Sequence, residues 1–248
     1  MARILITGSS QGLGLMAGQL LIEEGHDVVL HARTEDRDPG ISDVVVGDFS
    51  SMAEVRSVAE QAARLGPFDA VIHNVALGYQ ERRRVVTPDG LERVFAVNVA
   101  APYLLTALMP RPKRLVYLSS GMHLGASPDL GDLLWERRRW NGSQAYAESK
   151  FWDVVLAFGV ARRWPDVPSN AVDPGWVATR MGGRGAPDDL SRGHVTQVRL
   201  ALGDIPGTGG YYHHEEPSRT HPAVHDTDLQ DSFLARCAEL TGAELSVV

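Results

Sequence analysis

Short apolar runs alternate with segments of helical apolar spacing from the first residues of this chain, and this alternation constrains its fold more than any other feature. The runs are continuous, as expected for strands that helices cover on both faces. The predicted strands are residues 3–7, 27–32, 43–47, 69–74, 114–120, 168–175 and 208–213. The predicted helices are residues 13–25, 51–66, 87–109, 144–164 and 227–241. Repeated β–α units predict an α/β fold, a doubly wound parallel sheet of about seven strands, with residues 1–248 as a single domain.

Two helix starts are predicted from their capping residues. Thr87 and Pro88 are typical of a helix N-terminus and are expected to begin the helix of residues 87–109. Thr227 and Gln230 have the spacing of a capping box, so we expect them to open the last helix.

The charge balance argues against nucleic acid as a partner. The formal net charge is -7, and an acidic protein repels a phosphate backbone. Two short arginine runs, residues 82–84 and 137–139, are flanked by Glu81 and Glu136. We interpret both runs as solvated surface.

The single cysteine and the hydropathy pattern predict a cytoplasmic protein. Cys237 cannot form an internal disulfide, which fits a reducing compartment, and its helical context predicts a small buried apolar side chain. No apolar run approaches the length of a membrane span, so none is expected. The N-terminus leads directly into a strand without the layout of a signal peptide.

A glycine-rich loop, residues 7–14, follows the first predicted strand and opens the first helix. Glycines permit a tight turn and close approach of the backbone to a pyrophosphate, and the helix N-terminus offers free N–H groups to that anion. The alternative is an ordinary βα turn. In its strand–turn–helix context, the loop favours a dinucleotide site.

The end of the second strand favours NADP(H) over NAD. An NAD site usually places a carboxylate there, whereas this strand ends in His31 and Ala32 and is followed by Arg33. A guanidinium suits the 2′-phosphate of NADP, with Ser9 and Ser10 as possible additional donors. The alternative is a surface arginine.

Asp48 follows the third predicted strand and has two open interpretations. Its carboxylate could accept a hydrogen bond from the adenine amino group, since it lies at a carboxyl-terminal strand end. It could equally cap the next helix.

Tyr146 and Lys150 form the candidate catalytic pair. Four residues apart in a helical segment, they lie on one face, and the ammonium is expected to lower the pKa of the phenol. The alternative is a helix surface pair. Ser119 and Ser120 close the fifth strand, where a hydroxyl can hydrogen-bond a substrate oxygen. Asn98 is unusual within a helix, so a polar role and a satisfied interior amide both stay open.

These motifs stand in order along the chain, and together they resemble the short-chain dehydrogenase/reductase family from Arg3 to about Thr179. The resemblance implies a Rossmann-type fold and a catalytic tetrad of Asn98, Ser120, Tyr146 and Lys150. It also implies that the lysine holds the nicotinamide ribose and that the asparagine helps to hold a proton-relay water. The cofactor-binding positions it implies are Gly8, Ser10, Gln11, Gly12, Leu13, Gly14, Arg33, Asp48, Phe49, Asn74, Val75, Ala76, Tyr146, Lys150, Pro174, Gly175, Val177 and Thr179.

The chain departs from the family pattern in three places. Val75 and Ala76 stand after Asn74 where the family usually has Ala-Gly, which adds methyl groups to the cofactor bed. The segment between Ser120 and Tyr146 is long and is similar to the retinol-dehydrogenase-like branch. The third departure is a histidine-rich tail whose spacing matches no standard ligand set, so we favour a polar surface loop and predict no metal site. Its residues are His213, His214, Glu215, Glu216, His221 and His225.

The predicted activity is NADP(H)-dependent interconversion of an alcohol and a carbonyl, with Tyr146 as general acid and base. The expected substrate is a hydrophobic small molecule, and the resemblance leaves a homo-oligomer possible. A glycine-rich lid is expected after Thr179. Trp135, Trp176 and other apolar side chains could line a pocket, although ordinary packing is the alternative; the others are Met122, Trp140 and Met181. The first alternative function is a non-catalytic NADP-sensing regulator on the same fold. The second is an isomerase or lyase, which usually has a TGxxGxxG loop and a larger C-terminal domain.

Overall fold

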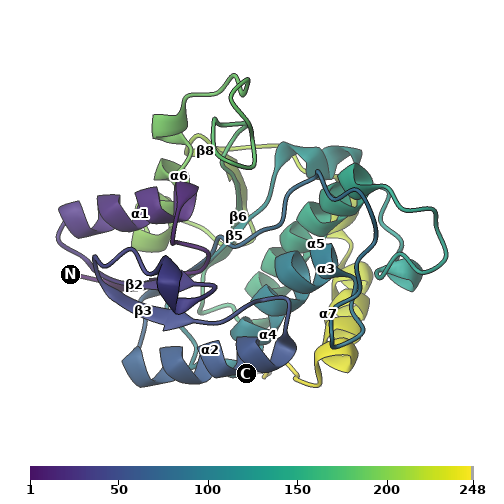
Figure 1. The fold of residues 1–248 in the computed structure, drawn as a ribbon, viewed down its shortest axis with the longest axis horizontal. Helices are drawn as coiled ribbons and strands as arrows, with labels where there is room; N and C mark the ends of the chain where they lie inside the picture. Colours follow the sequence, from purple (N-terminus) through teal and green to yellow (C-terminus); the bar gives the residue numbers. More distant parts are fainter. Residues whose placement is uncertain (247–248) are drawn as a thin grey trace.

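The computed structural model describes residues 1–246 and contains one eight-stranded sheet with helices on both faces (Figure 1). The strand order is β3-β2-β1-β4-β5-β6-β7-β8, parallel throughout except for the antiparallel β7–β8 pair. The predicted α/β fold is confirmed, and the short β8 is an addition to it. The strands are β1 (Arg3–Ile6), β2 (Asp27–Ala32), β3 (Asp43–Val46), β4 (Ala70–His73), β5 (Leu115–Leu118), β6 (Ser169–Asp173), β7 (Tyr211–His213) and β8 (Glu216–Pro217).

Two helical layers cover the sheet, and each buries its own apolar cluster. Helices α1 (Gly12–Glu23) and α6 (Val195–Leu202) lie on one face (Figure 1). The opposite face carries α2 (Met52–Leu65), α4 (Ala101–Leu108), α5 (Gly142–Arg163) and α7 (Thr227–Thr241). Successive strand residues point to opposite faces, so each apolar strand supplies both clusters.

Helix α5 is the central helix of the second layer. Every residue from Ala145 to Ala161 is buried, because β5, β6, α7 and residues 93–100 and 121–125 pack along α5. Within the described residues, 1–246, no helix is both long enough and apolar enough to cross a membrane.

The predicted helix of residues 87–109 begins later than its Thr-Pro sequence suggested. The backbone N–H of Gly90 bonds back to the Thr87 carbonyl at 3.0 Å, so these residues form a turn. Glu92 is the true cap, because its carboxylate accepts the N–H groups of Val94 and Phe95, each at 2.9 Å. The helix then runs through α3 (Arg93–Phe95), a π turn (Ala96–Ala100) and α4.

The capping box predicted for the last helix is wrong by one residue. Asp226 is the N-cap of α7, and its carboxylate accepts the N–H groups of Asp228 and Leu229 at 2.9 and 3.2 Å. Gln230 instead donates to the carbonyl of Val224 at 2.8 Å. An aspartate directly before the predicted threonine therefore provides the cap in its place.

The arginine runs are only partly solvated. Arg138 lies over the ring of Trp135, and its guanidinium bonds the carboxylates of Asp132 at 3.0 Å and Glu148 at 2.8 Å. Both carboxylates are buried, with side-chain exposures of 2% and 4%. The prediction of a solvated side chain is wrong for Arg138, because the segment of residues 126–141 brings its guanidinium against Glu148 of α5.

Cys237 is a buried thiol on α7, as its helical context predicted. Its side chain is fully buried in the larger apolar cluster. Burial raises the pKa of the Cys237 thiol, because the thiolate would lose its hydration. The thiol therefore acts as a small apolar side chain.

Candidate active site

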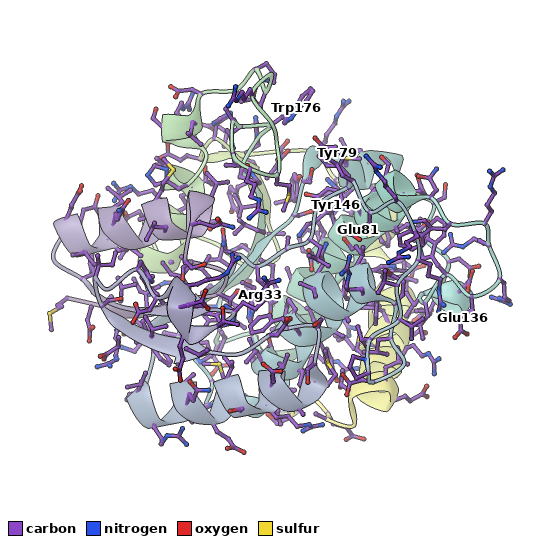
Figure 2. All side chains as sticks on the ribbon, in the orientation of Figure 1. Arg33, Tyr79, Glu81, Glu136, Tyr146 and Trp176 are labelled. Carbon is purple, nitrogen blue, oxygen red and sulfur yellow. The ribbon has the colours of Figure 1, made fainter. Side chains whose placement is uncertain are left out.

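The carboxyl ends of the central parallel strands gather the predicted site residues at one edge of the sheet. The glycine-rich loop follows β1, Asn74 follows β4, Ser120 follows β5 and Pro174 follows β6. Tyr146 comes from α5 and lies toward this edge (Figure 2). Neighbouring parallel strands ending together is the arrangement that creates a ligand crevice in α/β sheets.

The glycine loop is held by the segment that follows β4. The Asn74 amide donates to the carbonyls of Thr7 and Gly8 at 2.9 and 3.0 Å, and the N–H of Val75 reaches the Thr7 hydroxyl at 3.2 Å. A Cβ added to Gly8 would lie 2.7 Å from the Cα of Val75, and one added to Gly14 would lie 2.5 Å from the Asn74 amide nitrogen. Glycine is therefore required where these two segments touch.

The middle of the same loop is open. Gly12 has a φ of +60°, and a Cβ added there would meet nothing within 4 Å. Gln11 precedes α1 with an extended backbone and makes no side-chain cap, and Ser10 is half-buried beside it. The first N–H groups of α1 thus have no side-chain acceptor at Gln11, so this cradle fits an anionic group such as a pyrophosphate.

The side chain of His31 holds the glycine-rich loop in place through hydrogen bonds. Its Nδ1 accepts the N–H of Gly8 at 2.9 Å, so its Nε2 carries the proton and donates to the carbonyl of Gly47 at 2.9 Å. Burial lowers the pKa of His31 to about 4, so the ring is neutral at physiological pH. The sequence analysis used His31 only to mark the strand end; a histidine in the last position but one of a strand gave no signal of this role.

The sequence analysis allowed Ser9 as a donor to the 2′-phosphate, but its side chain points into the protein. It is fully buried, its hydroxyl donates to the carbonyl of Ile6 at 2.7 Å and it accepts the N–H of His31 at 2.8 Å. The predicted contact of Ser9 with a phosphate is therefore wrong, because both hydrogen-bonding functions of the hydroxyl serve the β1–β2 connection.

Arg33 stands exposed just beyond β2 (Figure 2). Within residues 1–246 it forms no ion pair with the acidic side chains nearby. The pKa of Asp36 is lowered by the Thr34 hydroxyl first and by the charges of Arg37 and Arg33 next. The guanidinium of Arg33 is thus available at the end of β2, where a 2′-phosphate would lie.

Asp48 does not cap the helix that follows it. Ser51 is the N-cap of α2, while Asp48 accepts the N–H of Ser50 at 2.8 Å. The capping interpretation is therefore wrong, and the adenine contact stays a prediction. The ring of Phe49 is buried against the ring of His31, with 4.3 Å between centroids, so its side chain serves packing.

Tyr146 and Lys150 lie on one face of α5, as their spacing predicted. The Lys150 ammonium is 5.8 Å from the centroid of the Tyr146 ring. Burial raises the pKa of Tyr146, and the Lys150 charge and the Ser120 hydroxyl only partly oppose that rise. The sequence analysis expected a lowered pKa; it identified the ammonium correctly and did not include the stronger effect of burial.

The two serines after β5 have different partners. Ser119 is buried and its hydroxyl donates to the carbonyl of Lys150 at 2.8 Å, which ties β5 to α5. The Ser120 hydroxyl accepts the N–H of Met122 at 3.3 Å and lies by Tyr146. The geometry therefore separates a structural serine from a serine that faces the phenol.

Asn98 lies in the π turn before α4, and its side chain is fully used. Its oxygen accepts the N–H of Leu77 at 2.7 Å, and its nitrogen donates to the Leu77 carbonyl at 3.1 Å and to the Ser149 hydroxyl at 2.9 Å. The satisfied-amide interpretation is thus realised, and the amide ties the segment after β4 to α5. Contact with a relay water stays a prediction.

Three side chains that the sequence analysis did not assign also surround Tyr146. The ring of Tyr79 meets the Tyr146 ring edge-on at 5.9 Å (Figure 2). Asp173 ends β6, with one carboxylate oxygen on the N–H of Gly175 at 2.9 Å and the other 3.8 Å from His213. The charge of Asp173 raises the pKa of Tyr146. Its place at a strand end directly before Pro174 was the signal that could have found it.

Tyr211 is the third of these side chains. It is 5% exposed, and its hydroxyl has no hydrogen-bond partner among the described residues. Burial raises the pKa of Tyr211 most, and the charge of Asp173 adds to the rise. A buried phenol beside Asp173 thus adds a free polar group to the wall of the site.

The segment after β6 closes back on the glycine loop. A Cβ added to Gly193 would lie 3.0 Å from the Leu13 side chain and 3.3 Å from the Pro174 carbonyl. Val177 is buried and pairs with Asp188 in an isolated bridge, while Thr179 accepts the N–H of Gly182 at 3.2 Å. Loop residues 174–193 therefore lie beside the predicted cofactor bed.

The aromatic residues proposed for an apolar pocket separate into two places. Trp135 is buried and packs against Trp140 at 5.5 Å, in the segment that covers α5, so ordinary packing accounts for it. Trp176 is 54% exposed on the loop after β6 (Figure 2). Met181 of that loop is the neighbour that a Cβ on Gly78 would meet at 2.8 Å. Only Trp176 and Met181 belong to the loop beside the site.

The histidines of the C-terminal region bond protein groups. The rings of His213 and His214 meet edge-on with 3.9 Å between their centroids, His221 accepts the N–H of Ala223 at 3.2 Å, and His225 meets the Thr220 hydroxyl at 2.9 Å. Among residues 1–246 there is no group of three or more His, Cys, Asp or Glu side chains placed to hold a metal ion.

Comparison with known proteins places the chain in a family. The family model for short chain dehydrogenases matches residues 2–189. An uncharacterized oxidoreductase of Emericella nidulans is 41% identical, and the alignment covers 98% of each chain. Retinol dehydrogenase 13 of Homo sapiens is 28% identical over 72% of this chain and 60% of its own length.

A solved structure has the same fold along the whole chain. It is the crystal structure of an uncharacterized protein from Mycobacterium paratuberculosis, with a TM-score of 0.84 and 22% identity, and the match covers 100% of this chain and 96% of the other. At that identity the match concerns the fold alone. Because the family model spans most of the sequence and the Emericella relative aligns along nearly all of it, the chain belongs to the short-chain dehydrogenase family of oxidoreductases.

Proposed function

We propose that this protein is an NADP(H)-dependent oxidoreductase that interconverts an alcohol and a carbonyl on a hydrophobic small molecule. The observation that carries the proposal is the meeting of Tyr146, Lys150 and Ser120 at the sheet edge that also holds the open glycine loop. A proton donor, a cation and a hydroxyl at one strand edge suit a reaction in which negative charge develops on a carbonyl oxygen.

In the direction of reduction, the residues divide the work as follows. Ser120 and Tyr146 hydrogen-bond the carbonyl oxygen, and Tyr146 donates its proton there. Lys150 keeps positive charge beside the phenol as that proton leaves. Lys150 and a water near Asn98 then restore the proton on Tyr146. NADP(H), when bound, supplies the hydride. The raised pKa of Tyr146 keeps the phenol protonated, which suits a general acid.

The residues that would hold the cofactor fall into three groups. Gly8, Gly12 and Gly14 shape the pyrophosphate cradle, Arg33 takes the 2′-phosphate and Asp48 takes the adenine. The NADP preference rests on Arg33, because the tip of β2 carries a guanidinium and no carboxylate. The other expected contacts are those of Ser10, Gln11, Leu13, Phe49, Asn74, Val75, Ala76, Tyr146, Lys150, Pro174, Gly175, Val177 and Thr179.

The experiment is turnover of NADPH with a panel of lipophilic aldehydes and ketones, followed by the loss of NADPH absorbance. We expect consumption with some members and little with NADH. NADPH binding without turnover across a broad panel would favour the regulator in place of the enzyme. Absence of NADPH binding would contradict both functions.

The setting of the enzyme stays a prediction. A cytoplasmic location, a single domain over residues 1–248, a possible homo-oligomer and no nucleic-acid partner are expected. Kinship with the retinol-dehydrogenase-like branch is part of the proposal, because it would favour lipophilic substrates. Size-exclusion chromatography with light scattering measures the oligomeric state directly.

A further inference from the structure

Lys150 is bound by a carboxylate that no sequence motif singled out. Its ammonium donates to Asp153 at 2.8 Å, one turn further along α5, and to the Leu118 carbonyl at the end of β5 at 2.7 Å. The side chains of Lys150 and Asp153 are only 2% and 3% exposed. The lysine that the proposed reaction needs is therefore held in a buried ion pair.

The other Asp153 oxygen has no such partner. This atom is buried and makes no hydrogen bond within residues 1–246. Tyr117 of β5 lies close enough that the charge of Asp153 raises its pKa, and the Tyr117 hydroxyl already bonds the Thr106 hydroxyl at 2.8 Å. Burying a carboxylate with one unpaired oxygen costs folding free energy, so we expect Asp153 to have a function beside Lys150.

The groups that face Asp153 come from three elements. Lys150 and Tyr146 lie on α5 itself, and Tyr117 lies on β5. His73 of β4 stacks on the Tyr117 ring at 4.6 Å, and burial lowers the pKa of His73 to about 3, so that ring is neutral. Lys150 is therefore the cation among these four groups, and the charge of Asp153 acts on it and on Tyr146.

We propose that Asp153 is a positioning residue for the reaction, whose carboxylate holds the Lys150 ammonium against the end of β5 and limits the positive field that Lys150 exerts on Tyr146. This inference rests on the proposed function for its purpose and on the contacts of Lys150 and Asp153 for its geometry. Asp153 acts through Lys150, and its negative charge keeps the phenol in the protonated form that donates to a carbonyl.

The sign of the effect follows from the charges around Tyr146. Lys150 lowers the pKa of Tyr146, whereas Asp153 raises it. The charge of Asp173 also raises it, and that charge remains in an Asp153 variant. Removing the Asp153 charge therefore leaves the ammonium less opposed, so the pKa of Tyr146 must fall. Burial raises the pKa of Asp153 itself, and Lys150 opposes that rise. Protonation of Asp153 would lower the pKa of Tyr146, as its replacement by asparagine would.

The experiment is a pH titration of tyrosinate absorbance in the cofactor-free protein, with Tyr146 assigned by subtracting Tyr146→Phe. Asp153→Asn keeps the shape and can still accept from Lys150 while removing the charge. We expect its Tyr146 midpoint to lie lower than that of the unaltered protein by about one pH unit. In an active enzyme, the loss of carbonyl reduction at alkaline pH moves down by the same amount.

Two further variants keep the test specific. Asp153→Glu retains the charge and is expected to keep the Tyr146 midpoint. Glu148→Gln removes another buried carboxylate from α5, one that pairs with Arg138 at 2.8 Å. We expect it to leave the Tyr146 midpoint unchanged, as a matched control for a general loosening of the helix.

The outcomes separate this inference from the proposed function. A lowered midpoint in Asp153→Asn alone supports the positioning role, whether or not a substrate has been found. An unchanged midpoint in Asp153→Asn, or an equal shift in Glu148→Gln, overturns it. If Asp153→Asn does not fold, Asp153→Ser, which also removes the charge, is titrated in its place: a lowered midpoint with Glu148→Gln unchanged supports the role, and an unchanged midpoint overturns it. Lack of NADPH turnover in the unaltered protein contradicts only the proposed function.

Discussion

The imidazole of His31 accepts the backbone N–H of Gly8 at 2.9 Å, so a neutral histidine at the end of one strand holds the glycine loop that follows another. The same ring donates to Gly47 after β3. One side chain of β2 thus links the connections that follow β1 and β3, and it can do so only while it lacks a second proton.

Stability is therefore expected to fall with acidification through this histidine. The pKa of His31 is lowered from 6.5 to about 4, so the unfolded chain binds a proton at pH 5 that the folded chain does not. The free energy of unfolding should fall by about 2 kcal/mol between roughly pH 7 and 5 from His31 alone. Urea unfolding of the unaltered protein and of His31→Gln at both pH values measures this, and equal pH dependence in the two would reject it.

Replacing Tyr146 with phenylalanine should leave cofactor binding nearly intact and remove most activity. The ring is buried and its edge contact with Tyr79 does not need the hydroxyl. Loss of the general acid lowers kcat by roughly 100- to 10,000-fold. Stopped-flow NADPH oxidation and a fluorescence binding titration check the two halves, and retained turnover would exclude the proton-donor role.

Arg33→Ala should reduce the preference for NADPH over NADH. A charge-assisted hydrogen bond to phosphate is worth about 1.5–3 kcal/mol, so the affinity ratio should fall by roughly 10- to 100-fold. Calorimetry with both cofactors provides the ratio. Arg83→Ala, an exposed arginine elsewhere on the surface, is the control that should not change it. An unaltered ratio in Arg33→Ala would leave the phosphate without its assigned partner.

Arg138→Ala should destabilise the fold far more than the same change at Arg137. Arg138 bonds two buried carboxylates, those of Asp132 and Glu148, whereas the side chain of Arg137 is 67% exposed. Removing one partner of a buried ion network costs about 3–5 kcal/mol, and an exposed pair contributes about 1 kcal/mol or less. Thermal unfolding by circular dichroism compares the two variants, and similar losses would contradict the buried role.

The sheet was predictable because its strands are continuous apolar runs, and the catalytic pair because four-residue spacing places Tyr146 and Lys150 on one helical face. The start of α3 was not predictable from the sequence, because the Thr87–Pro88 sequence suits a turn as well as a helix. Cap positions shift by a residue when a stronger acceptor such as Asp226 stands next to the expected one.

The polar groups that support the site were less visible in the sequence. His31 and Asp153 act through contacts with Gly8 and Lys150 that depend on how elements pack, and local patterns carry no record of those neighbours. Arg138 was misassigned for the same reason, because its partners become buried only when residues 126–141 fold onto α5. Burial likewise raised the pKa of Tyr146, whereas the sequence predicted that it would be lowered.

The enclosure of α5 within one chain limits how copies of this protein can associate. Helix α7, residues 121–125 and Arg138 pack against the helix that bears Tyr146 and Lys150. A second copy would have to displace them to dock there. Any homo-oligomer is therefore expected to form through other surfaces, so each protomer keeps its reacting phenol and lysine independent of its neighbour.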